Sequence, residues 1–443
     1  MRVLIITPEY PPDHGGGIIT YYRELVPALI AEGCKVTILR GSAYVHGNTD
    51  EEIDGVPIKN LESRRFKDWL ARLVALEMFP ELHRHCAAAF ALHEQAREGE
   101  GYDVVEVVDW GMQFLPWAIS SKAPFLIQLH GSDGQIALHG PCIGREMEGA
   151  FSLLLERAGM ADTPEISGCS KANSGWWASL LSRKAHYIPP PFRVKVPDLS
   201  SHRNGWMTFG RVQKWKGPQT ACDAWQLLGE KAPALQWYGR PMVHGESGSS
   251  MADWLSKHYP KIWSRKIIHH LPVPPAEVSA LMAKAKVVLV PSVWDTFNLV
   301  TAEAMAHECV AVVSDGAGSV DLVEHGVNGF VFPAGNSAAL AELVQKIESL
   351  PENKMRTIGK LAAETVSGKM NPRIVAKEKI KLYQVAKLPN KKGEWLKKAL
   401  FSGAENKCRK RFAFLDQQPL LGLAKYVTKR SINKVKSRFQ YPH

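Results

Sequence analysis

Paired cysteines and long apolar runs are both scarce in this chain of 443 residues. The seven cysteines are scattered, with no Cys-x-x-Cys spacing, which favours reduced thiols over a disulfide framework or a thiolate metal site. No segment reaches the roughly 20 apolar residues of a membrane-spanning helix. The apolar run at the N-terminus is too short for a signal peptide, so we expect a cytoplasmic protein.

Sequence patterns for metal ligands are also missing. The chain has no Asp-x-Asp triplet, a spacing that commonly holds a divalent ion against a diphosphate. His83, His85 and Cys86 are close in sequence, but on a helix they face different sides, and no second ligand pair accompanies them. We therefore expect neither a metal nor a cofactor.

Length and composition indicate two domains. Hydrophobic residues make up 45% of the chain, enough to fill two cores, and 443 residues exceed what one core usually spans. Alternating strand-like and helix-like patterns indicate a parallel α/β architecture. Consecutive prolines at 189–191 favour an extended connection. We predict a first domain over residues 1–195 and a second over 196–370.

Excess positive charge is confined to one end of the chain. Residues 387–443 hold 15 Lys and Arg against 3 Asp and Glu, whereas the rest of the chain holds 40 against 41. Apolar side chains, among them Trp395, Leu396, Leu400 and Phe401, alternate with these basic residues, a pattern that suits an anionic membrane surface. A helical appendage packed on the core is the alternative, and a tail that binds nucleic acid fits less well.

The stretch Pro291–Glu303, PSVWDTFNLVTAE, follows an apolar run that suits a buried parallel strand. Asp295 then falls on a loop, and Asn298 is placed to cap a helix over Leu299–Ala306. The free N–H groups of such a helix start form an anion site, for which phosphate is the usual guest. Asp295 and Glu303 cannot ligate phosphate, so we interpret them as acceptors for sugar and ribose hydroxyls. Capping acids beside a buried strand are the alternative.

A glycine triplet stands near the start of the chain. The run Val3–Thr7 predicts a first strand, and Gly15, Gly16 and Gly17 precede a helical pattern over Ile18–Ala31. Glycines let the backbone approach a ligand closely, and the helix start adds N–H donors. Any flexible turn can carry such a triplet, but this one stands at the first strand-to-helix crossing, where open parallel sheets bind ligands.

Two further segments offer cations and a histidine. Arg211 and Lys216 lie on a loop before an amphipathic pattern over Thr220–Leu228, so both could converge on one diphosphate. Two solvated surface cations are the alternative. His130 stands at the end of an apolar strand beside small residues, from where it can reach a substrate, although a lone histidine is more often structural.

In this order along the chain, these segments resemble the retaining glycosyltransferases of family four. Those enzymes have a glycine-rich N-terminal loop, a strand-end histidine, an Arg and Lys pair, and a Glu-Gly-Phe-Gly segment followed by a second Glu. The text EAMAHECVAVVSDGAGSVDLVEHGVNGFVFPAGN, which begins at Glu303, is similar to the family's next segment and places the turn Gly316–Ser319 near the donor.

The resemblance implies an α/β protein with the GT-B fold, in which two Rossmann-like domains face each other across a cleft, with a basic C-terminal tail. Residues 1–195 would form the acceptor-side domain and 196–370 the nucleotide-sugar donor domain. Residues 371–390 would form a helix that crosses back to the first domain, and 391–443 a basic amphipathic tail.

The resemblance also implies a retaining hexosyltransferase that moves a sugar from a nucleotide diphosphate donor to a glycan or lipid-linked acceptor in cell-surface polysaccharide or glycolipid assembly. It would act in the cytoplasm, peripheral on the inner face of the membrane. The catalytic residues implied are His130, Arg211, Lys216 and Asp295. The donor-binding residues implied are Gly15, Gly16, Gly17, Arg211, Lys216, Phe297, Asn298, Leu299 and Glu303.

The chain departs from the family pattern in the donor segment. The first acid is Asp295, and the two glycines are Thr296 and Asn298, which predicts a narrower donor pocket. Two other functions stay open: a sugar phosphorylase or sugar-nucleotide epimerase of the same fold, and a non-catalytic nucleotide-binding partner in polymer assembly. No residue identifies the donor base and sugar, the acceptor, the linkage or the oligomeric state.

Overall fold

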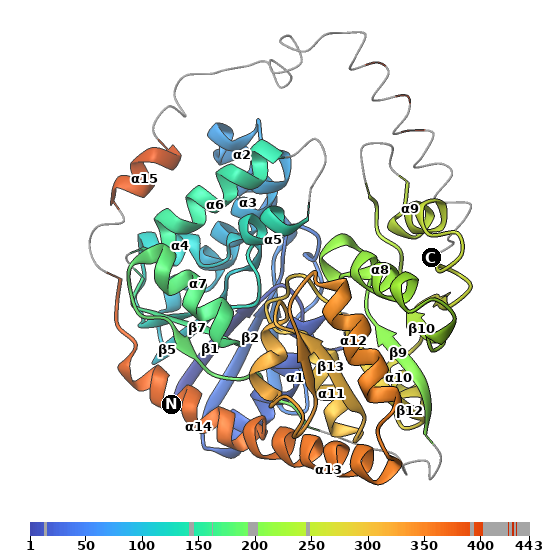
Figure 1. Cartoon of the computed structure of the whole chain (residues 1–443). Helices are drawn as coiled ribbons and strands as arrows, with labels where there is room; N and C mark the ends of the chain where they lie inside the picture. Colours follow the sequence, from blue (N-terminus) through green and yellow to red (C-terminus); the bar gives the residue numbers. More distant parts are fainter. Residues whose placement is uncertain are drawn as a thin grey trace. The chain divides into compact units, whose positions relative to one another are not determined.

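The computed structural model describes residues 1–12, 16–140, 146–161, 163–193, 203–244, 249–389 and 394–401, with residues 424, 428 and 431. The chain divides into two compact units (Figure 1). Unit 1 comprises residues 1–138, 144–193 and 367–411, and unit 2 comprises residues 139–143, 194–366 and 412–443.

Unit 1 is built on a sheet whose described strands run in the order β3-β4-β2-β1-β5-β6-β7-β8. Only β3 pairs antiparallel, with β4, and the other neighbouring strands are parallel. The strands are β1 (Arg2–Thr7), β2 (Lys35–Arg40), β3 (Glu51–Ile53), β4 (Val56–Asn60), β5 (Val104–Val108), β6 (Phe125–Leu129), β7 (Glu165–Gly168) and β8 (His186–Tyr187). Every residue of β5 and β6 is buried, as expected for central parallel strands covered on both faces.

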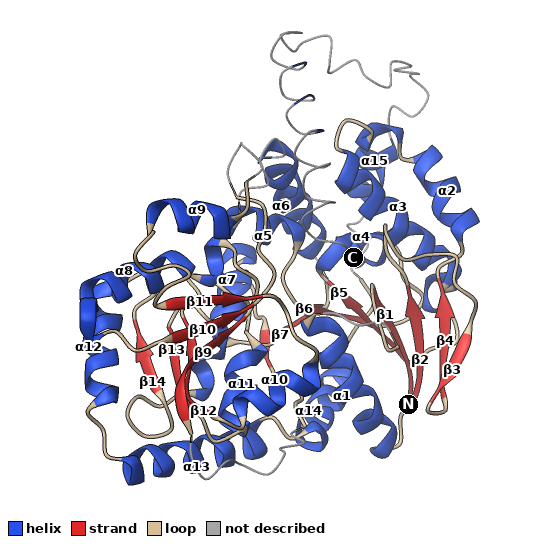
Figure 2. Cartoon of the chain, turned by 90° about the vertical axis from the view of Figure 1, so that its right-hand side faces the viewer, coloured by secondary structure: helices blue, strands red, loops and turns tan. Residues whose placement is uncertain are grey.

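Helices cover both faces of this sheet (Figure 2). They are α1 (Gly17–Ala31), α2 (Ser63–Arg72), α3 (Pro80–Gln95), α4 (Leu115–Ile119), α5 (Asp133–His139), α6 (Glu146–Met160), α7 (Lys171–Leu181), α14 (Pro372–Val385) and α15 (Glu394–Phe401). Local signals set their starts: Ser170 caps α7 by accepting from the N–H of Asn173, and Pro80 stands in the first turn of α3. None of the described helices is both long enough and apolar enough to cross a membrane.

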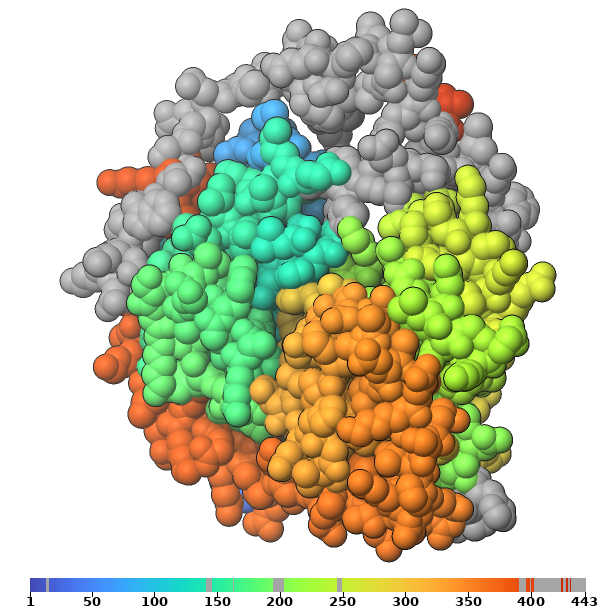
Figure 3. All heavy atoms as spheres, in the orientation of Figure 1, coloured from blue at the N-terminus to red at the C-terminus, as the bar shows by residue number. Residues whose placement is uncertain are grey.

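Unit 2 is built on a parallel sheet whose described strands run in the order β11-β10-β9-β12-β13-β14. The strands are β9 (Asn204–Phe209), β10 (Leu235–Tyr238), β11 (Ile267–His270), β12 (Ala285–Val290), β13 (Val310–Ser314) and β14 (Phe330–Phe332). The helices are α8 (Pro218–Leu228), α9 (Met251–His258), α10 (Pro275–Met282), α11 (Leu299–Ala306), α12 (Ser337–Glu348) and α13 (Glu352–Lys369). Helices α12 and α13, orange in Figure 3, form part of the outer surface of unit 2.

Each sheet has a topological switch point. Strand β1 lies between β2 and β5, and strand β9 lies between β10 and β12. In each sheet the chain first adds strands on one side of this strand and then crosses over to add strands on its other side. Loops that follow such strands diverge and leave a crevice at the carboxyl edge of the sheet, which is where open α/β sheets bind ligands. The fold therefore directs attention to the loops after β1 and β5 in unit 1 and after β9 and β12 in unit 2.

Several sequence predictions are confirmed. The strand expected over Val3–Thr7 is β1, and the helix expected over Leu299–Ala306 is α11 with these bounds. Asn298 caps α11, because its side chain accepts from the N–H of Val300. The domain bounds and the crossing-back helix stay predictions; α14, within the range 371–390, packs against α1 in unit 1.

The expectation for the basic tail is wrong for two of its apolar residues. Leu396 and Leu400 on α15 are 3% and 6% exposed, and both belong to the hydrophobic core of unit 1. The ring of Phe401 lies 5.5 Å from that of Phe90 and 6.1 Å from that of Trp69. These side chains cover the helical layer of unit 1 and do not face a membrane. Most of the tail beyond Phe401 lies outside the described residues.

Candidate functional site

The ammonium of Lys216 forms an ion pair with the carboxylate of Asp295 at the switch point of unit 2. Lys216 lies on the loop after β9, and Asp295 lies on the loop after β12, the neighbouring strand. The two side chains are 18% and 15% exposed. Partial burial reduces solvent screening, so the two charges act more strongly on each other and on a ligand than surface charges do.

The backbone around Lys216 is fixed by the neighbouring loop. The N–H of Val293 donates to the carbonyl of Trp215 at 2.8 Å, which ties the two loops together. Gly217 follows with φ +73°, and a Cβ added there would lie 1.8 Å from the carbonyl oxygen of Pro291. Only glycine fits this position, both for its conformation and for the close approach of the two backbones.

Asp295 is held by the loop after β13. Its N–H donates to the carbonyl of Gly316 at 2.9 Å, and its own carbonyl accepts from the N–H of Gly318 at 3.0 Å. The N–H of Ser319 donates to the carbonyl of Phe297 at 2.7 Å, which extends the same pairing. Gly316 also leaves no room for a side chain, since a Cβ there would lie 2.3 Å from the carbonyl oxygen of Val293. The Asp295 carboxylate is therefore pre-positioned by a rigid pair of loops.

The start of α11 supplies N–H donors beside Asp295. Asn298 has φ +77°, a left-handed conformation that asparagine tolerates better than most residues, at a position where the resembling family has glycine. Its side chain accepts from the N–H of Val300 at 3.2 Å and donates to Ser292 Oγ at 3.2 Å. The asparagine thus keeps the backbone turn and folds its own side chain onto the helix start. Glu303 lies half-buried further along α11.

Arg211 stands at the other end of the loop that carries Lys216. The residue is exposed to solvent. Partial desolvation lowers the pKa of its guanidinium, and the carboxylate of Asp295 acts to raise it, so the two groups lie within electrostatic range. Arg211, Lys216 and Asp295 therefore belong to one charged group at the carboxyl edge of the sheet.

In unit 1, His130 follows β6 and is held by a residue that sequence reasoning missed. The carboxylate of Asp109, directly after β5, accepts from the N–H of His130 at 2.7 Å and from the N–H of Gly131 at 3.0 Å. Burial raises the pKa of Asp109 to about 7. In the sequence, Asp109 is marked only by its position directly after the two valines that end β5.

The imidazole of His130 is packed against aromatic rings. Its ring lies 4.8 Å from that of Tyr21 and 5.7 Å from that of Tyr22, both edge-on. Burial, together with the positive charge of Lys379, lowers the pKa of His130 to about 3. The side chain is therefore neutral near pH 7 and suits hydrogen bonding to a ligand more than charge compensation.

The glycine-rich loop precedes α1 in unit 1. The helix begins at Gly17, and Gly16 occupies the N-cap with an extended backbone. Among the described residues no side chain caps this helix start, and a Cβ on Gly16 would meet nothing within 4 Å. The first N–H groups of a helix have no partner inside the helix, so those of α1 are candidate donors at the carboxyl end of β1. Gly15 lies outside the described residues.

His83, His85 and Cys86, which lie close in sequence and were not expected to bind a metal, have separate surroundings. His83 Nε2 hydrogen-bonds with the carbonyl of Leu70 at 2.9 Å, His85 bonds to Asp133 at 2.8 Å, and Cys86 is fully buried in the core. Within the described ranges, no three His, Cys, Asp or Glu side chains are grouped as metal ligands.

The structure places the predicted residues of unit 2 on the loops after the neighbouring strands β9 and β12 and on α11. Cations and free helix N–H groups suit a phosphate-bearing ligand, and a fixed carboxylate suits hydroxyl groups. The unit 2 residues at this edge are Arg211, Lys216, Asp295, Phe297, Asn298, Leu299 and Glu303. His130, Gly16 and Gly17 lie at the carboxyl edge of the sheet of unit 1.

The chain is similar in sequence to known glycosyltransferases. The family described as Glycosyl transferases group 1 matches residues 203–349, and the Glycosyl transferase 4-like domain matches residues 16–191. The chain is 23% identical over 411 residues to an uncharacterized glycosyltransferase of Methanocaldococcus jannaschii, covering 87% of this chain and 98% of the relative. It is 26% identical over 400 residues to the D-inositol 3-phosphate glycosyltransferase of an Arthrobacter species, covering 82% and 89%.

Solved structures share the fold. The sucrose-phosphate synthase of Thermosynechococcus elongatus superposes with a TM-score of 0.66 at 18% identity, covering 86% of this chain and 98% of that chain. Anabaena HepE in complex with UDP-glucose superposes with a TM-score of 0.60 at 16% identity, covering 87% and 99%. These likenesses show that the two sheets form the two Rossmann-like domains of the GT-B fold.

Proposed function

Since this chain belongs to the glycosyl transferases group 1 family, we propose that it moves a sugar from a nucleoside diphosphate sugar to an acceptor hydroxyl, with retention of the anomeric configuration. The observation that carries the proposal is the Lys216–Asp295 ion pair at the switch point of unit 2, with Arg211 and the start of α11 beside it. A diphosphate needs positive charge and N–H donors, and a sugar needs a fixed hydroxyl acceptor. This edge of the sheet supplies both.

In the reaction, the bond between the anomeric carbon and the diphosphate oxygen breaks, and the electron pair leaves with the diphosphate. Lys216 and Arg211 stabilise the negative charge that grows on this leaving group. The acceptor oxygen forms the new bond on the same face of the sugar, and its proton passes to the departing phosphate oxygen. Asp295 orients the donor sugar through its hydroxyls once Lys216 turns toward the diphosphate.

A uridine nucleotide is the first donor to test. The HepE structures are described as complexes with UDP and with UDP-glucose. The acceptor we propose is a glycan or a lipid-linked saccharide of cell-surface polysaccharide or glycolipid assembly, reached in the cytoplasm. Glu303 would hold the ribose hydroxyls of the nucleotide, and Phe297 with Asn298 and Leu299 would line the donor.

The test is the release of nucleoside diphosphate from UDP-, GDP- and ADP-sugars, with and without chelator, in the presence of a membrane lipid extract. Release from one donor, dependent on the extract and insensitive to chelator, is the expected result. Release that requires added inorganic phosphate would identify a phosphorylase. Nucleotide binding without any release would overturn the transferase and favour a non-catalytic partner.

We also propose that the basic segment beyond Phe401 attaches the enzyme to an anionic membrane surface, where basic residues each contribute on the order of 1 kcal/mol. Because Leu396 and Leu400 belong to the core of unit 1, the truncation that tests this must cut after Phe401 and not before α15. The truncated chain should release nucleoside diphosphate as before but sediment less with vesicles of anionic lipid. Unchanged sedimentation would contradict the attachment.

A further inference from the structure

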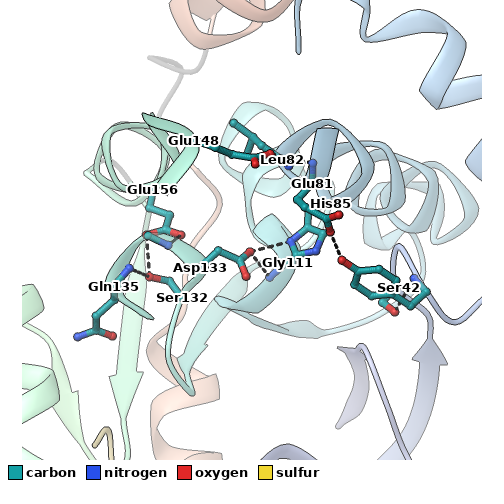
Figure 4. Close-up of polar contacts among 12 residues, drawn as sticks. Ser42, Glu81, Leu82, His85, Gly111, Ser132, Asp133, Gln135, Glu148 and Glu156 are labelled. Atoms are coloured by element: carbon teal, nitrogen blue, oxygen red, sulfur yellow. Dashed lines mark hydrogen bonds and ion pairs between the residues drawn. The ribbon is translucent and has the colours of Figure 1, made fainter. Parts of the chain in front are cut away.

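A second polar cluster of unit 1, which we call the His85 site, consists of His85, Asp133, Gly111, Tyr44 and Trp110. Figure 4 shows His85 beside Asp133, with Glu81 and Glu148 on the helices above them. None of these residues has a role in the proposed donor chemistry. Part of the cluster nevertheless lies on the two loops that hold His130, since Gly111 comes two residues after Asp109 and Asp133 two residues after Gly131, whereas His85 lies on α3 and Tyr44 after β2.

Asp133 is held by one of its two oxygens. Its Oδ2 accepts from His85 Nδ1 at 2.8 Å and from the N–H of Gly111 at 3.0 Å. The side chain is 23% exposed, and among the described residues no protein group bonds to Oδ1. The carboxylate is thus fixed in orientation while one acceptor oxygen is open to a ligand.

His85 carries an unsatisfied nitrogen. The residue is 7% exposed, and its Nε2 is buried without a hydrogen-bond partner in the described part of the chain. A buried polar atom without a partner is costly, about 1–3 kcal/mol, and such an atom marks a place where a ligand or a water completes the bonding. The bond from Nδ1 to Asp133 fixes the plane of the ring and, with it, the direction of Nε2.

Aromatic rings surround this pair. The ring of Tyr44 meets that of His85 edge-on at 5.8 Å, and the ring of Trp110 lies 5.1 Å from it. Tyr44 is 57% exposed and its hydroxyl donates to the carboxylate of Glu81, so its ring is held in place with a surface that a ligand can contact. Aromatic faces beside fixed hydrogen-bonding groups are suited to a ring with one apolar face and several hydroxyls.

The charges at the site disfavour an anionic ligand. Glu81 and Glu148 act on His85 together with Asp133, and these carboxylates outweigh desolvation and raise the pKa of His85. Arg84, the basic neighbour of Tyr44, donates to the carbonyl of Ala43 at 2.8 Å through one terminal nitrogen and keeps its Nε without a partner in the described part of the chain. The three carboxylates that act on His85 outnumber this single cation. A phosphate placed beside Asp133 would meet like charge at close range.

We propose that the His85 site binds the acceptor, and that it takes a neutral polyhydroxylated ring, with Asp133 accepting from one hydroxyl and His85 bonding to a second. This inference rests on the proposed transferase function. The neutral acceptor proposed here differs from the phosphorylated inositol in the name of the Arthrobacter relative. The sugar or cyclitol unit would lie on the loops after β5 and β6, next to His130.

The test uses saturation-transfer NMR on the full chain with UDP present. The probes are methyl hexosides and myo-inositol as neutral rings, and hexose 6-phosphates as anionic ones. Wild-type protein should bind a neutral probe more tightly than its phosphorylated counterpart. Asp133→Asn should weaken that binding about tenfold, whereas Asp68→Asn, at an exposed position on α2, should not change it.

Tyr44→Ala gives a second variant at an exposed position, in case Asp133→Asn does not fold. It should weaken the neutral probe severalfold while UDP affinity stays within twofold. Preference for the phosphorylated probes, binding of no neutral probe, or unchanged binding in both variants would overturn the proposal. Donor-sugar hydrolysis is measured separately: its absence would count against the transferase function and not against this site.

Discussion

The ammonium of Lys379 on α14 lies 2.6 Å from the carboxylate of Glu106 on β5, and both side chains are fully buried. The same carboxylate accepts from the hydroxyls of Tyr22 at 2.9 Å and Tyr383 at 2.7 Å. Lys379 also donates to Gln128 Oε1 at 2.9 Å. This network joins α14, which follows most of unit 2 in the chain, to the central strands of unit 1.

Replacing Lys379 by methionine should destabilise unit 1. The substitution keeps the volume but leaves Glu106 buried without its counter-charge, which costs about 3–5 kcal/mol, or roughly 6–20 °C in the unfolding midpoint of a unit of this size. The measurement is thermal unfolding followed by circular dichroism. Lys381→Met is the matched control, because the side chain of Lys381 is 69% exposed on the same helix. Equal midpoints for the two variants would contradict the anchoring role.

Replacing Lys216 by alanine should reduce turnover. The lost cation stabilises charge on the leaving diphosphate, and removal of one such group lowers kcat about 10²–10³-fold. Nucleoside diphosphate release under saturating donor measures this. Lys214→Ala removes an exposed cation from the same turn and should leave the rate within twofold. Undiminished turnover in Lys216→Ala would reject the assignment of this lysine.

Replacing Gly217 by alanine should disturb the turn that carries Lys216. Gly217 has φ +73°, a conformation that costs an alanine about 1–2 kcal/mol. The Cβ of that alanine would also lie 1.8 Å from the Pro291 carbonyl oxygen, and relieving this clash costs about 1–3 kcal/mol more. Gly335 has φ +74° with nothing within 4 Å of a built Cβ, so Gly335→Ala should show the strain alone. Urea unfolding compares the two variants, and equal losses of stability would argue against the close approach at Gly217.

The stability of unit 1 should fall in mild acid in part because of His130. Its pKa is about 3 in the folded chain, below the ordinary value of 6.5, so between these values the unfolded chain binds a proton that the folded chain does not. Stability from this group is present above about pH 6.5 and is lost as the pH falls toward 3. His130→Asn removes the titration, so its unfolding midpoint should depend less steeply on pH across this window. An unaltered pH profile would show that His130 titrates alike in both states.

The helix start after Asp295 could be predicted because it depends on residues that are neighbours in the sequence. Asn298 is a good capping residue and tolerates a positive φ, and the residues after it have a helical pattern, so the start of α11 follows from neighbours in the chain. The sequence also indicated charged loops beside helix starts, since Asp295 follows a buried strand and Lys216 precedes a helical pattern. It did not indicate that the two would bond to each other, because this pairing requires β9 and β12 to be neighbours in the sheet.

Other positions could not be resolved from the chain alone. Lys377 and Lys381 have side chains that are 58% and 69% exposed, whereas Lys379 is fully buried, although all three stand in one basic helical stretch. His85 and Asp133 are 48 residues apart in the chain and meet only because α3 lies over the loop after β6. Leu396 and Leu400 form an apolar helix face that fits a membrane or a protein core equally well.

The sequence by itself determined the order of strands and helices, the two α/β domains and the residue types at the donor edge, because capping, periodicity and strand-end placement depend on near neighbours. Only the tertiary structure decided which lysine is buried, which acids hold His130 and His85, and which surface α15 covers. Those outcomes depend on which elements pack together, and the free energy of burying a charge or an apolar face depends on the partner that packing supplies.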